Sequence, residues 1–228
     1  MREPLIVAID GPSGVGKSTA ARRLARRLGV PFLDTGAMYR AIGLEVLERG
    51  VDPADQAAVE AVAALAEVTL HRRADGGFEV RLDGAPVEPR IRTAEVGEAT
   101  SAISAYPAIR SRMVALQREA ARRFGAVLEG RDIGTRVFPD TPHKFFLDAR
   151  PEVRGARRQR ELAAAGRAAT LDQVVADLSR RDRRDSTRAD SPLTRDASYT
   201  FVDTSDLATD DVVDALARAV VERMSGEP

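Results

Sequence analysis

Residues 5–19, LIVAIDGPSGVGKST, constrain the fold more than any other part of the sequence. A short apolar run ends at Asp10, and a glycine-rich turn then leads into a helical pattern. The turn has the spacing G-x-x-x-x-G-K-[ST], which is typical of a loop that binds phosphate groups, at Gly11, Gly16, Lys17 and Ser18. The sequence therefore predicts a buried strand, a phosphate-binding loop and a helix in succession.

The residue types in this loop suit phosphate chemistry. Glycines let successive backbone N–H groups point inward, and the positive end of the helix dipole acts at the same place. Lys17 can reach the β- and γ-phosphates, and the hydroxyl of Ser18 can ligate Mg²⁺. The chain has only two lysines, Lys17 and Lys144, and its other 33 basic residues are arginines. A compact ammonium at this position therefore indicates a specific requirement.

Composition excludes several classes of function. The 35 basic residues balance 35 acidic ones, so the charge indicates neither a nucleic-acid partner nor an acidic membrane. The absence of cysteine excludes disulfides and thiolate metal sites, as suits a reducing compartment. The first residues lack the layout of a signal peptide, and no apolar stretch approaches membrane-spanning length. We expect a monomeric cytoplasmic protein, and 228 residues suffice for one α/β domain with appended pieces.

Helical patterns alternate with short buried strands along most of the chain. Residues 20–28 read as a helix and residues 31–34 as a second strand, which together imply a parallel sheet with a right-handed crossover. We expect further strands at 126–128, 145–147 and 199–202. Further helices are expected from Thr35, from Asp52-Pro53, over 92–104 and 107–124, from a Thr170/Gln173 capping box through Arg188, and over 211–224.

One segment breaks this alternation. Apolar and polar residues alternate over 68–82 around an Asp75-Gly76-Gly77 turn, which predicts an antiparallel hairpin. We interpret it as an inserted subdomain. His71 and His143 are expected at the surface and are assigned no function.

Polar residues follow the predicted strands, where parallel sheets bind their ligands. Thr35 follows the second strand, and Arg131 and Asp132 follow the third. The chain lacks both the Asn-Lys-x-Asp and the Asp-x-x-Gly sequences of GTPase switches. Arginines are instead abundant at strand ends and on two helices, as phosphoryl transfer requires.

Six segments resemble the nucleoside monophosphate kinases and, among these, the bacterial cytidylate kinases. They are IDGPSGVGKST (9–19), LDTGAMYR (33–40), IRTAEV (91–96), EGRDIGT (129–135), FFLDA (145–149) and RRDRRDSTRADSPL (180–193). The resemblance implies the phosphate-loop α/β fold of that family, with a five-stranded parallel sheet, an inserted monophosphate-binding subdomain and a lid. The implied reaction transfers a phosphoryl group from MgATP to CMP or dCMP, giving CDP or dCDP.

The resemblance also implies a division of the chain. Residues 1–33, 125–150 and 171–228 form the core. Residues 34–124 form the CMP-binding domain, with an antiparallel insertion at about 66–92, and residues 151–170 form the lid. ATP is then expected to contact Gly11, Pro12, Ser13, Gly14, Val15, Gly16, Lys17, Ser18 and Thr19, with Arg154, Arg157 and Arg158 as lid cations and Ser18 on the metal.

The resemblance also implies which residues bind the acceptor nucleotide. Thr35 and Arg40 can hold the acceptor phosphate, while Arg131 and Arg181 clamp it and, with Lys17, stabilise the charge in transfer. Arg181, Asp185 and Arg188 fall at i, i+4 and i+7 and are expected on one helix face, with Asp185 binding ribose hydroxyls. Ser101, Arg110 and Asp132 suit the cytosine edge, because a carboxylate accepts from the N4 amino group and the others donate.

Several alternatives remain open from the sequence. Arg181 and Asp185 could form only an intrahelical ion pair, and the three lid arginines could be solvated surface charges. The acceptor could be another monophosphate or a small alcohol, as in shikimate-type kinases. The chain could also bind ATP without catalysing a reaction.

Overall fold

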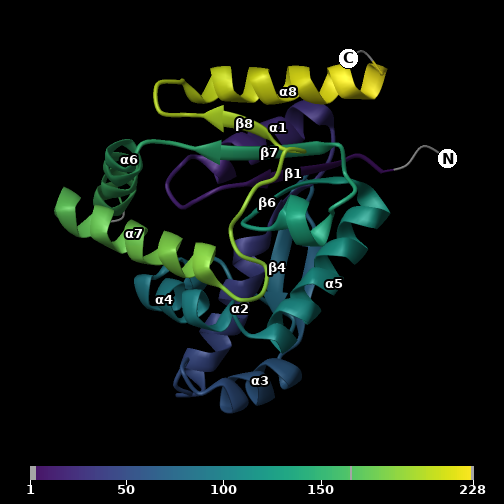
Figure 1. Cartoon of the computed structure of the whole chain (residues 1–228). Helices are drawn as coiled ribbons and strands as arrows, with labels where there is room; N and C mark the ends of the chain where they lie inside the picture. Colours follow the sequence, from purple (N-terminus) through teal and green to yellow (C-terminus); the bar gives the residue numbers. More distant parts are fainter. Residues whose placement is uncertain (1–3, 165, 227–228) are drawn as a thin grey trace.

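A five-stranded parallel sheet forms the centre of the computed structural model, which describes residues 4–164 and 166–226 (Figure 1). The strand order is β2–β6–β1–β7–β8. β1 pairs in parallel with both β6 and β7, so that Asp10 lies opposite Gly130 on one side and Phe146 on the other. The predicted parallel sheet is confirmed, with strands at β1 (Ile6–Asp10), β2 (Phe32–Asp34), β6 (Ala126–Gly130), β7 (His143–Asp148) and β8 (Thr200–Asp203).

Helices cover both faces of this sheet. Side chains alternate along each strand, so both faces carry apolar side chains that must be buried. Val7 and Ile9 of β1 lie in one apolar cluster with Leu24 of α1 (Lys17–Leu28) and Leu216 of α8 (Thr209–Ser225). Ala8, on the opposite face, lies in a second cluster with residues of α2 (Thr35–Glu48) and α5 (Pro107–Phe124). The end of β1 and the start of α1 are thereby held rigidly on either side of the predicted phosphate-binding loop.

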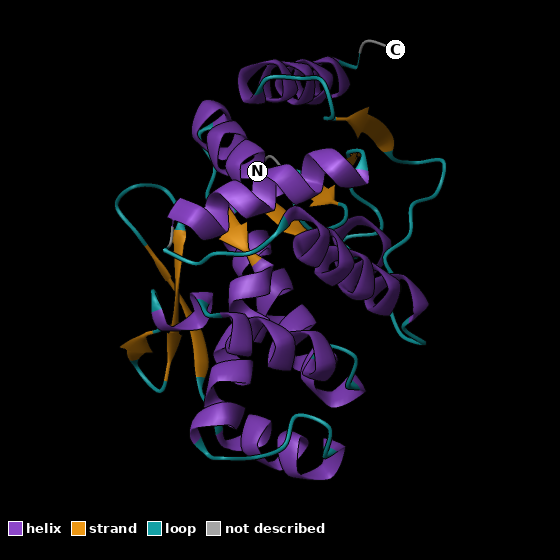
Figure 2. Cartoon of the chain, turned by 90° about the vertical axis from the view of Figure 1, so that its left-hand side faces the viewer, coloured by secondary structure: helices purple, strands orange, loops and turns teal. Residues whose placement is uncertain are grey.

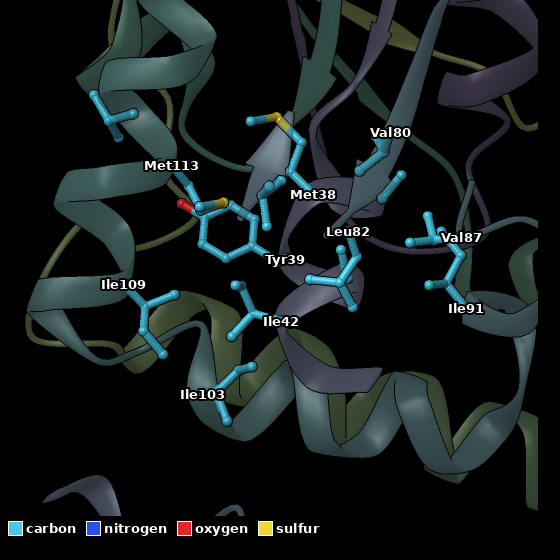
Figure 3. Packing of buried hydrophobic residues seen from close by; sticks show 14 of the residues in the cluster. Met38, Tyr39, Ile42, Val80, Leu82, Val87, Ile91, Ile103, Ile109 and Met113 are labelled. Atoms are coloured by element: carbon cyan, nitrogen blue, oxygen red, sulfur yellow. The ribbon is translucent and has the colours of Figure 1, made fainter. Parts of the chain in front are cut away.

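The second apolar cluster continues into a smaller body below the sheet (Figures 2 and 3). An antiparallel sheet there confirms the predicted hairpin, with a short third strand added to it. The backbone N–H of Phe32 donates to the carbonyl of Gly76 at 3.2 Å, so the hairpin tip contacts β2. The elements of this body are α3 (Gln56–Leu65), β3 (Val68–Arg72), β4 (Phe78–Leu82), β5 (Ala85–Pro86), a 3₁₀ turn η1 (Arg90–Arg92) and α4 (Ala94–Ile103).

Two sequence-based expectations are wrong in this part of the structure. No helix starts at Asp52-Pro53, because the carboxylate of Asp52 accepts the N–H of Ala54 at 2.9 Å and forms a turn. α3 starts only at Gln56, with Asp55 as its N-cap. The expected helix over 92–104 is likewise divided, because Thr93 caps α4 and separates it from η1.

His143 is also not at the surface. It begins β7, and β7 pairs with β1 on one side and β8 on the other, so only 6% of His143 is exposed. Burial lowers the pKa of its imidazole.

Two long helices pack together beside the carboxyl ends of the strands (Figure 1). These are α6 (Pro151–Ala164) and α7 (Leu171–Thr187), and the predicted Thr170/Gln173 capping box begins α7. α7 ends at Thr187, so Arg188 lies just beyond it with an extended ψ of 137° rather than on a helix face. Of the helices in the described ranges, none is long and apolar enough to cross a membrane.

Candidate functional site

A cleft of about 270 Å³ opens where the phosphate-binding loop meets the carboxyl ends of β2 and β6. It brings together residues from the loop, α2, α4, α5, β6, α6 and α7. Most of the predicted site residues line it: Ser13, Gly14, Gly16, Lys17, Ser18, Thr19, Thr35, Arg40, Ser101, Arg110, Arg131, Asp132, Arg158, Arg181, Asp185 and Arg188. Gly11, Pro12, Val15, Arg154 and Arg157 do not line it.

The loop between β1 and α1 has a backbone that requires glycine. Gly11 has φ of +146°, and a Cβ there would lie 2.0 Å from the carbonyl oxygen of Leu147. Gly16 caps α1 with φ of 91°, in the left-handed region that glycine adopts without strain. The chain can therefore turn tightly enough to direct the N-terminus of α1 into the cleft, where its free N–H groups favour an anion.

Lys17 is buried at the first position of α1. Its Nζ donates to the carbonyl oxygen of Pro12 at 2.6 Å. Burial, together with the nearby Arg131 guanidinium, lowers the pKa of Lys17 to about 7. A phosphate bound in the cleft would place a negative charge beside this buried ammonium and stabilise its protonated form, so the geometry favours anion binding.

Glu129 is a site residue that the sequence analysis missed. It is the penultimate residue of β6, lines the cleft, is 6% exposed, and has a pKa raised by burial and by the nearby Asp34 carboxylate. Ser18 lines the same cleft, and its hydroxyl opposes the rise in the pKa of Glu129. A hydroxyl and a carboxylate oxygen side by side are ligands that fit Mg²⁺. An acidic residue at the end of a predicted strand was the available signal.

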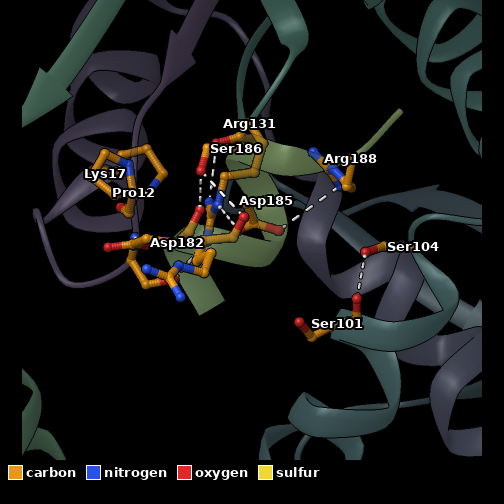
Figure 4. A network of polar contacts seen from close by, with 12 residues as sticks. Pro12, Lys17, Ser101, Ser104, Arg131, Asp182, Asp185, Ser186 and Arg188 are labelled. Carbon is orange, nitrogen blue, oxygen red and sulfur yellow. Dashed lines mark hydrogen bonds and ion pairs between the residues drawn. The ribbon is translucent and has the colours of Figure 1, made fainter. Parts of the chain in front are cut away.

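Arg131 and Asp185 form the central ion pair of the cleft (Figure 4). Arg131 Nε donates to Asp185 Oδ2 at 2.8 Å, and Arg131 also donates to the Ser13 hydroxyl at 2.7 Å. Although burial alone would raise it, Arg131 and Arg188 lower the pKa of Asp185. The partner of Asp185 thus comes from the residue that follows β6, 54 residues away, and not from Arg181 of its own helix, as the ion-pair alternative assumed.

Arg181 and Arg188 leave donors available in the cleft. The Nε atoms of both are buried and have no hydrogen-bond partner among the described residues. Arg188 lies 3.9 Å from Asp185 and donates to the carbonyl oxygen of Ser191 at 2.9 Å. Burial, with Arg131 nearby, lowers the pKa of Arg181. A buried guanidinium donor without a partner costs folding free energy unless an anion or another acceptor takes its hydrogen bond.

Arg40 and Thr35 lie at the end of the cleft formed by α2. Arg40 donates to the carbonyl oxygen of Ile91 at 2.9 Å, and burial and Arg181 lower its pKa to about 10. The Thr35 hydroxyl donates to the carbonyl oxygen of Glu129 at 2.7 Å, so its oxygen remains able to accept. These contacts fix both side chains in front of the phosphate-binding loop.

One part of the cleft is a buried polar pocket formed by Arg110, Asp132 and Ser101. Arg110 is 2% exposed, forms an ion pair with Asp132, donates to the carbonyl oxygen of Ser104 at 3.1 Å, and lies 5.8 Å from the centre of the Tyr39 ring. The hydroxyl of Ser101 is buried without a hydrogen-bond partner in the described part of the chain. The pocket therefore offers donors and an acceptor beside an aromatic ring, as a nucleobase requires.

The three arginines expected in the lid have different environments. Arg158 lines the cleft and pairs with Glu161 at 2.9 Å. Arg157 instead points to the other side of the loop and donates to the carbonyl oxygen of Thr204 at 2.6 Å. Arg154 is buried and forms an ion pair with Asp182. In this arrangement Arg154 and Arg157 brace the phosphate-binding loop from behind.

Asp182 is a second residue that the sequence analysis did not identify. Its carboxylate accepts the backbone N–H of Ser13 at 3.4 Å and also pairs with Arg154. It thus connects the loop to both α6 and α7. No local pattern marks Asp182, because three elements must meet before its partners are adjacent.

Comparisons with known proteins agree with this geometry. A sequence model described as cytidylate kinase matches residues 7–222. The cytidylate kinase of Corynebacterium glutamicum is 52% identical over 218 residues, which cover 95% of this chain and 94% of the relative. That of Pelotomaculum thermopropionicum is 46% identical over 219 residues, covering 96% and 95%. An uncharacterized protein from Eubacterium ventriosum shares the fold, with a TM-score of 0.53 and 15% identity, over 97% of this chain and 100% of that one.

Proposed function

This chain belongs to the cytidylate kinase family, and on that premise we propose that its cleft transfers the γ-phosphoryl group of MgATP to the phosphate of CMP or dCMP, giving ADP and CDP or dCDP. One observation carries the proposal: a single cleft joins the phosphate-binding loop to a buried polar pocket. Lys17, Arg131 and Arg181 line this cleft. The family match does not favour another monophosphate, a small alcohol or ATP binding without catalysis.

The loop is the proposed site of the ATP phosphates. Backbone N–H groups of residues 13–19 and the Lys17 ammonium would bind the β- and γ-phosphates. Ser18 and Glu129 would hold Mg²⁺, which would neutralise charge on the phosphate oxygens. Arg158 extends this positive surface from α6.

The acceptor phosphate is proposed to lie between Arg40, Arg131 and Arg181. The Nε of Arg181 has no hydrogen-bond partner among the described residues, and the pKa of Arg40 is lowered to about 10. Both observations indicate guanidinium groups that a bound anion would stabilise. Because Arg131 also contacts Ser13 of the loop, it lies where it can stabilise charge on the phosphoryl group during transfer.

The buried pocket is proposed to bind cytosine. Asp132 would accept a hydrogen bond from the N4 amino group, while Ser101 and Arg110 would donate hydrogen bonds to N3 and O2. Asp185 and Arg188 would bind the ribose beside it. In this arrangement residues 34–124 hold the acceptor, and residues 151–170 close over ATP and exclude water.

The proposal is tested by ADP release at fixed MgATP with CMP, dCMP, UMP, AMP, GMP and shikimate as acceptors. CMP and dCMP are expected to give turnover. Asp132→Asn should narrow the ratio of kcat/KM for CMP over UMP, because an amide can turn its NH₂ toward the O4 of uracil. Turnover restricted to another acceptor would contradict the activity, and an unchanged ratio would contradict base reading by Asp132.

A further inference from the structure

Asp10 is a buried carboxylate that the proposed reaction does not use. It is the last residue of β1, is 0% exposed, and does not line the cleft. Its oxygens nevertheless accept three hydrogen bonds. Oδ1 accepts the N–H of Ile133 at 2.9 Å, while Oδ2 accepts the N–H of Gly134 at 2.9 Å and the hydroxyl of Tyr199 at 2.7 Å.

Two of these donors begin a turn that has no local cap. The chain forms a π-helical turn η2 (Ile133–Val137) directly after Asp132, and the side chain of Asp132 does not cap it. The first N–H groups of a helical turn have no partner within it, so an acceptor must come from elsewhere. Asp10 supplies that acceptor from β1, and its negative charge also interacts favourably with the positive end of the dipole of the turn.

The position of Asp10 brackets two cleft residues. In the sheet, Asp10 pairs with Gly130 of β6, immediately before Arg131. Its side chain then binds Ile133, immediately after Asp132. Arg131 and Asp132 are therefore the two residues between two points that are both fixed to Asp10.

The hydroxyl of Tyr199 joins a second segment to the same carboxylate. The Tyr199 ring packs edge-on against Phe146, with centroids 6.2 Å apart. Close packing leaves no room at Gly134, where a Cβ would lie 2.6 Å from the Tyr199 hydroxyl oxygen. Tyr199 ends the segment that begins at Arg188 and includes Asp190, which lies 3.8 Å from Arg110.

We propose that Asp10 is a positioning residue that sets the direction of Arg131 and Asp132 and thereby the selectivity of the cleft for a cytosine monophosphate. The proposal rests on the assignment of Asp132 to the base. Asp10 acts through the turn and does not touch a substrate. Burial raises the pKa of Asp10 to about 6, against hydrogen bonds from Gly134, Ile133 and Tyr199, so the group is ionised at neutral pH and can accept all three.

The decisive variant is Asp10→Asn, which keeps the shape of the side chain. An amide has one acceptor oxygen, so its NH₂ would face either the N–H of Ile133 or the donors of Gly134 and Tyr199. We expect KM for CMP to rise about tenfold and the CMP/UMP ratio of kcat/KM to narrow by a similar factor, while KM for ATP stays within about twofold. Asp148→Asn is the matched control, because Asp148 also ends a neighbouring strand but its carboxylate accepts, from the described residues, only the N–H of Ala149.

A second readout does not depend on substrate. Amide hydrogen exchange in the segment 131–137 should become faster in Asp10→Asn and stay unchanged in Asp148→Asn. Faster exchange together with the rise in KM and the narrowed ratio would support the proposal. Unchanged exchange, or a lower melting temperature with KM and the ratio unchanged, would overturn it, because Asp10 would then act only on stability.

Two further variants keep the test informative if Asp10→Asn does not fold. Tyr199→Phe removes one of the three donors and should give a smaller change of the same kind. Gly134→Ala should displace the turn through the Tyr199 hydroxyl while leaving Asp10 intact, and wild-type selectivity in that variant would count against the proposal. If Asp132→Asn leaves the CMP/UMP ratio of kcat/KM unchanged, the assignment of Asp132 to the base is wrong. The role of Asp10 is then decided by amide hydrogen exchange in segment 131–137 together with KM for CMP.

Discussion

Replacing Lys17 by methionine is expected to abolish turnover and to stabilise the nucleotide-free protein. Lys17 is 5% exposed, and burial lowers the pKa of its ammonium from the usual 10.5 to about 7. Each unit of this difference corresponds to about 1.4 kcal/mol, so holding the charge in the cleft costs up to about 4–5 kcal/mol at pH values below 7. Methionine has a similar length and carries no charge.

The net gain is smaller than this limit. Lys17→Met leaves the carbonyl oxygen of Pro12 without its donor, which costs about 1 kcal/mol or more. The cleft also admits water near the ammonium. We expect unfolding to become less favourable by about 1–3 kcal/mol at pH 6, which corresponds to a rise in Tm of about 2–12 °C for a chain of this size.

The pH dependence gives the sharper test. Below pH 7 the lysine is protonated in both the folded and the unfolded states, so the whole cost is present. Between pH 7 and 10.5 the folded protein holds a neutral amine while the unfolded chain is still protonated, and the cost falls by about 1.4 kcal/mol per pH unit. The gain from Lys17→Met should therefore be largest at pH 6 and should have largely disappeared by pH 9.

The assay is thermal unfolding at pH 6 and pH 9 in buffers free of phosphate, sulfate and nucleotide. Lys144→Met is the control, since Lys144 is the only other lysine and is equally buried. Its Nζ donates to the Ser198 hydroxyl at 3.0 Å and lies 6.0 Å from the Tyr199 ring centre, so its loss should lower Tm. A Lys17→Met protein that melts below wild type at pH 6, or shifts equally at both pH values, would refute the reasoning.

Two other variants test the cleft itself. Lys17→Arg keeps the charge, but a planar fork does not fit the place of a compact ammonium, so kcat should fall by about 10²-fold or more; near-normal turnover would contradict this. Asp185→Ala removes the partner of Arg131 and should raise KM for CMP by the equivalent of about 1.5–3 kcal/mol while KM for ATP is unchanged. Asp177→Ala on the same helix, whose partner is the exposed Arg180, is the matched control, and a loss of Tm alone in Asp185→Ala would indicate a structural role only.

The partners of the cleft residues depended on the tertiary structure. Asp185 was expected to face ribose or Arg181, yet its hydrogen-bond partner is Arg131, which follows β6 and lies 54 residues earlier in the chain. The links from Asp182 to the loop and from Asp10 to η2 join segments separated by 123 residues or more. The Asp10 contact depends on the strand order β2–β6–β1–β7–β8, which places β6 beside β1, and the Asp182 contact depends on the packing of α7 against the loop. Patterns of neighbouring residues encode neither arrangement.

The sequence by itself determined the features that depend on neighbouring residues. The spacing of glycines and Lys17 determined the phosphate-binding loop, alternation over 68–82 determined the hairpin, and Thr170 with Gln173 determined the start of α7. These features arise from backbone conformation, capping and side-chain periodicity within a few residues. Burial of His143 and the role of Glu129 were decided only when β6 and β7 took their places beside β1, because desolvation and charge pairing depend on what packs around a residue and not on its neighbours in the chain.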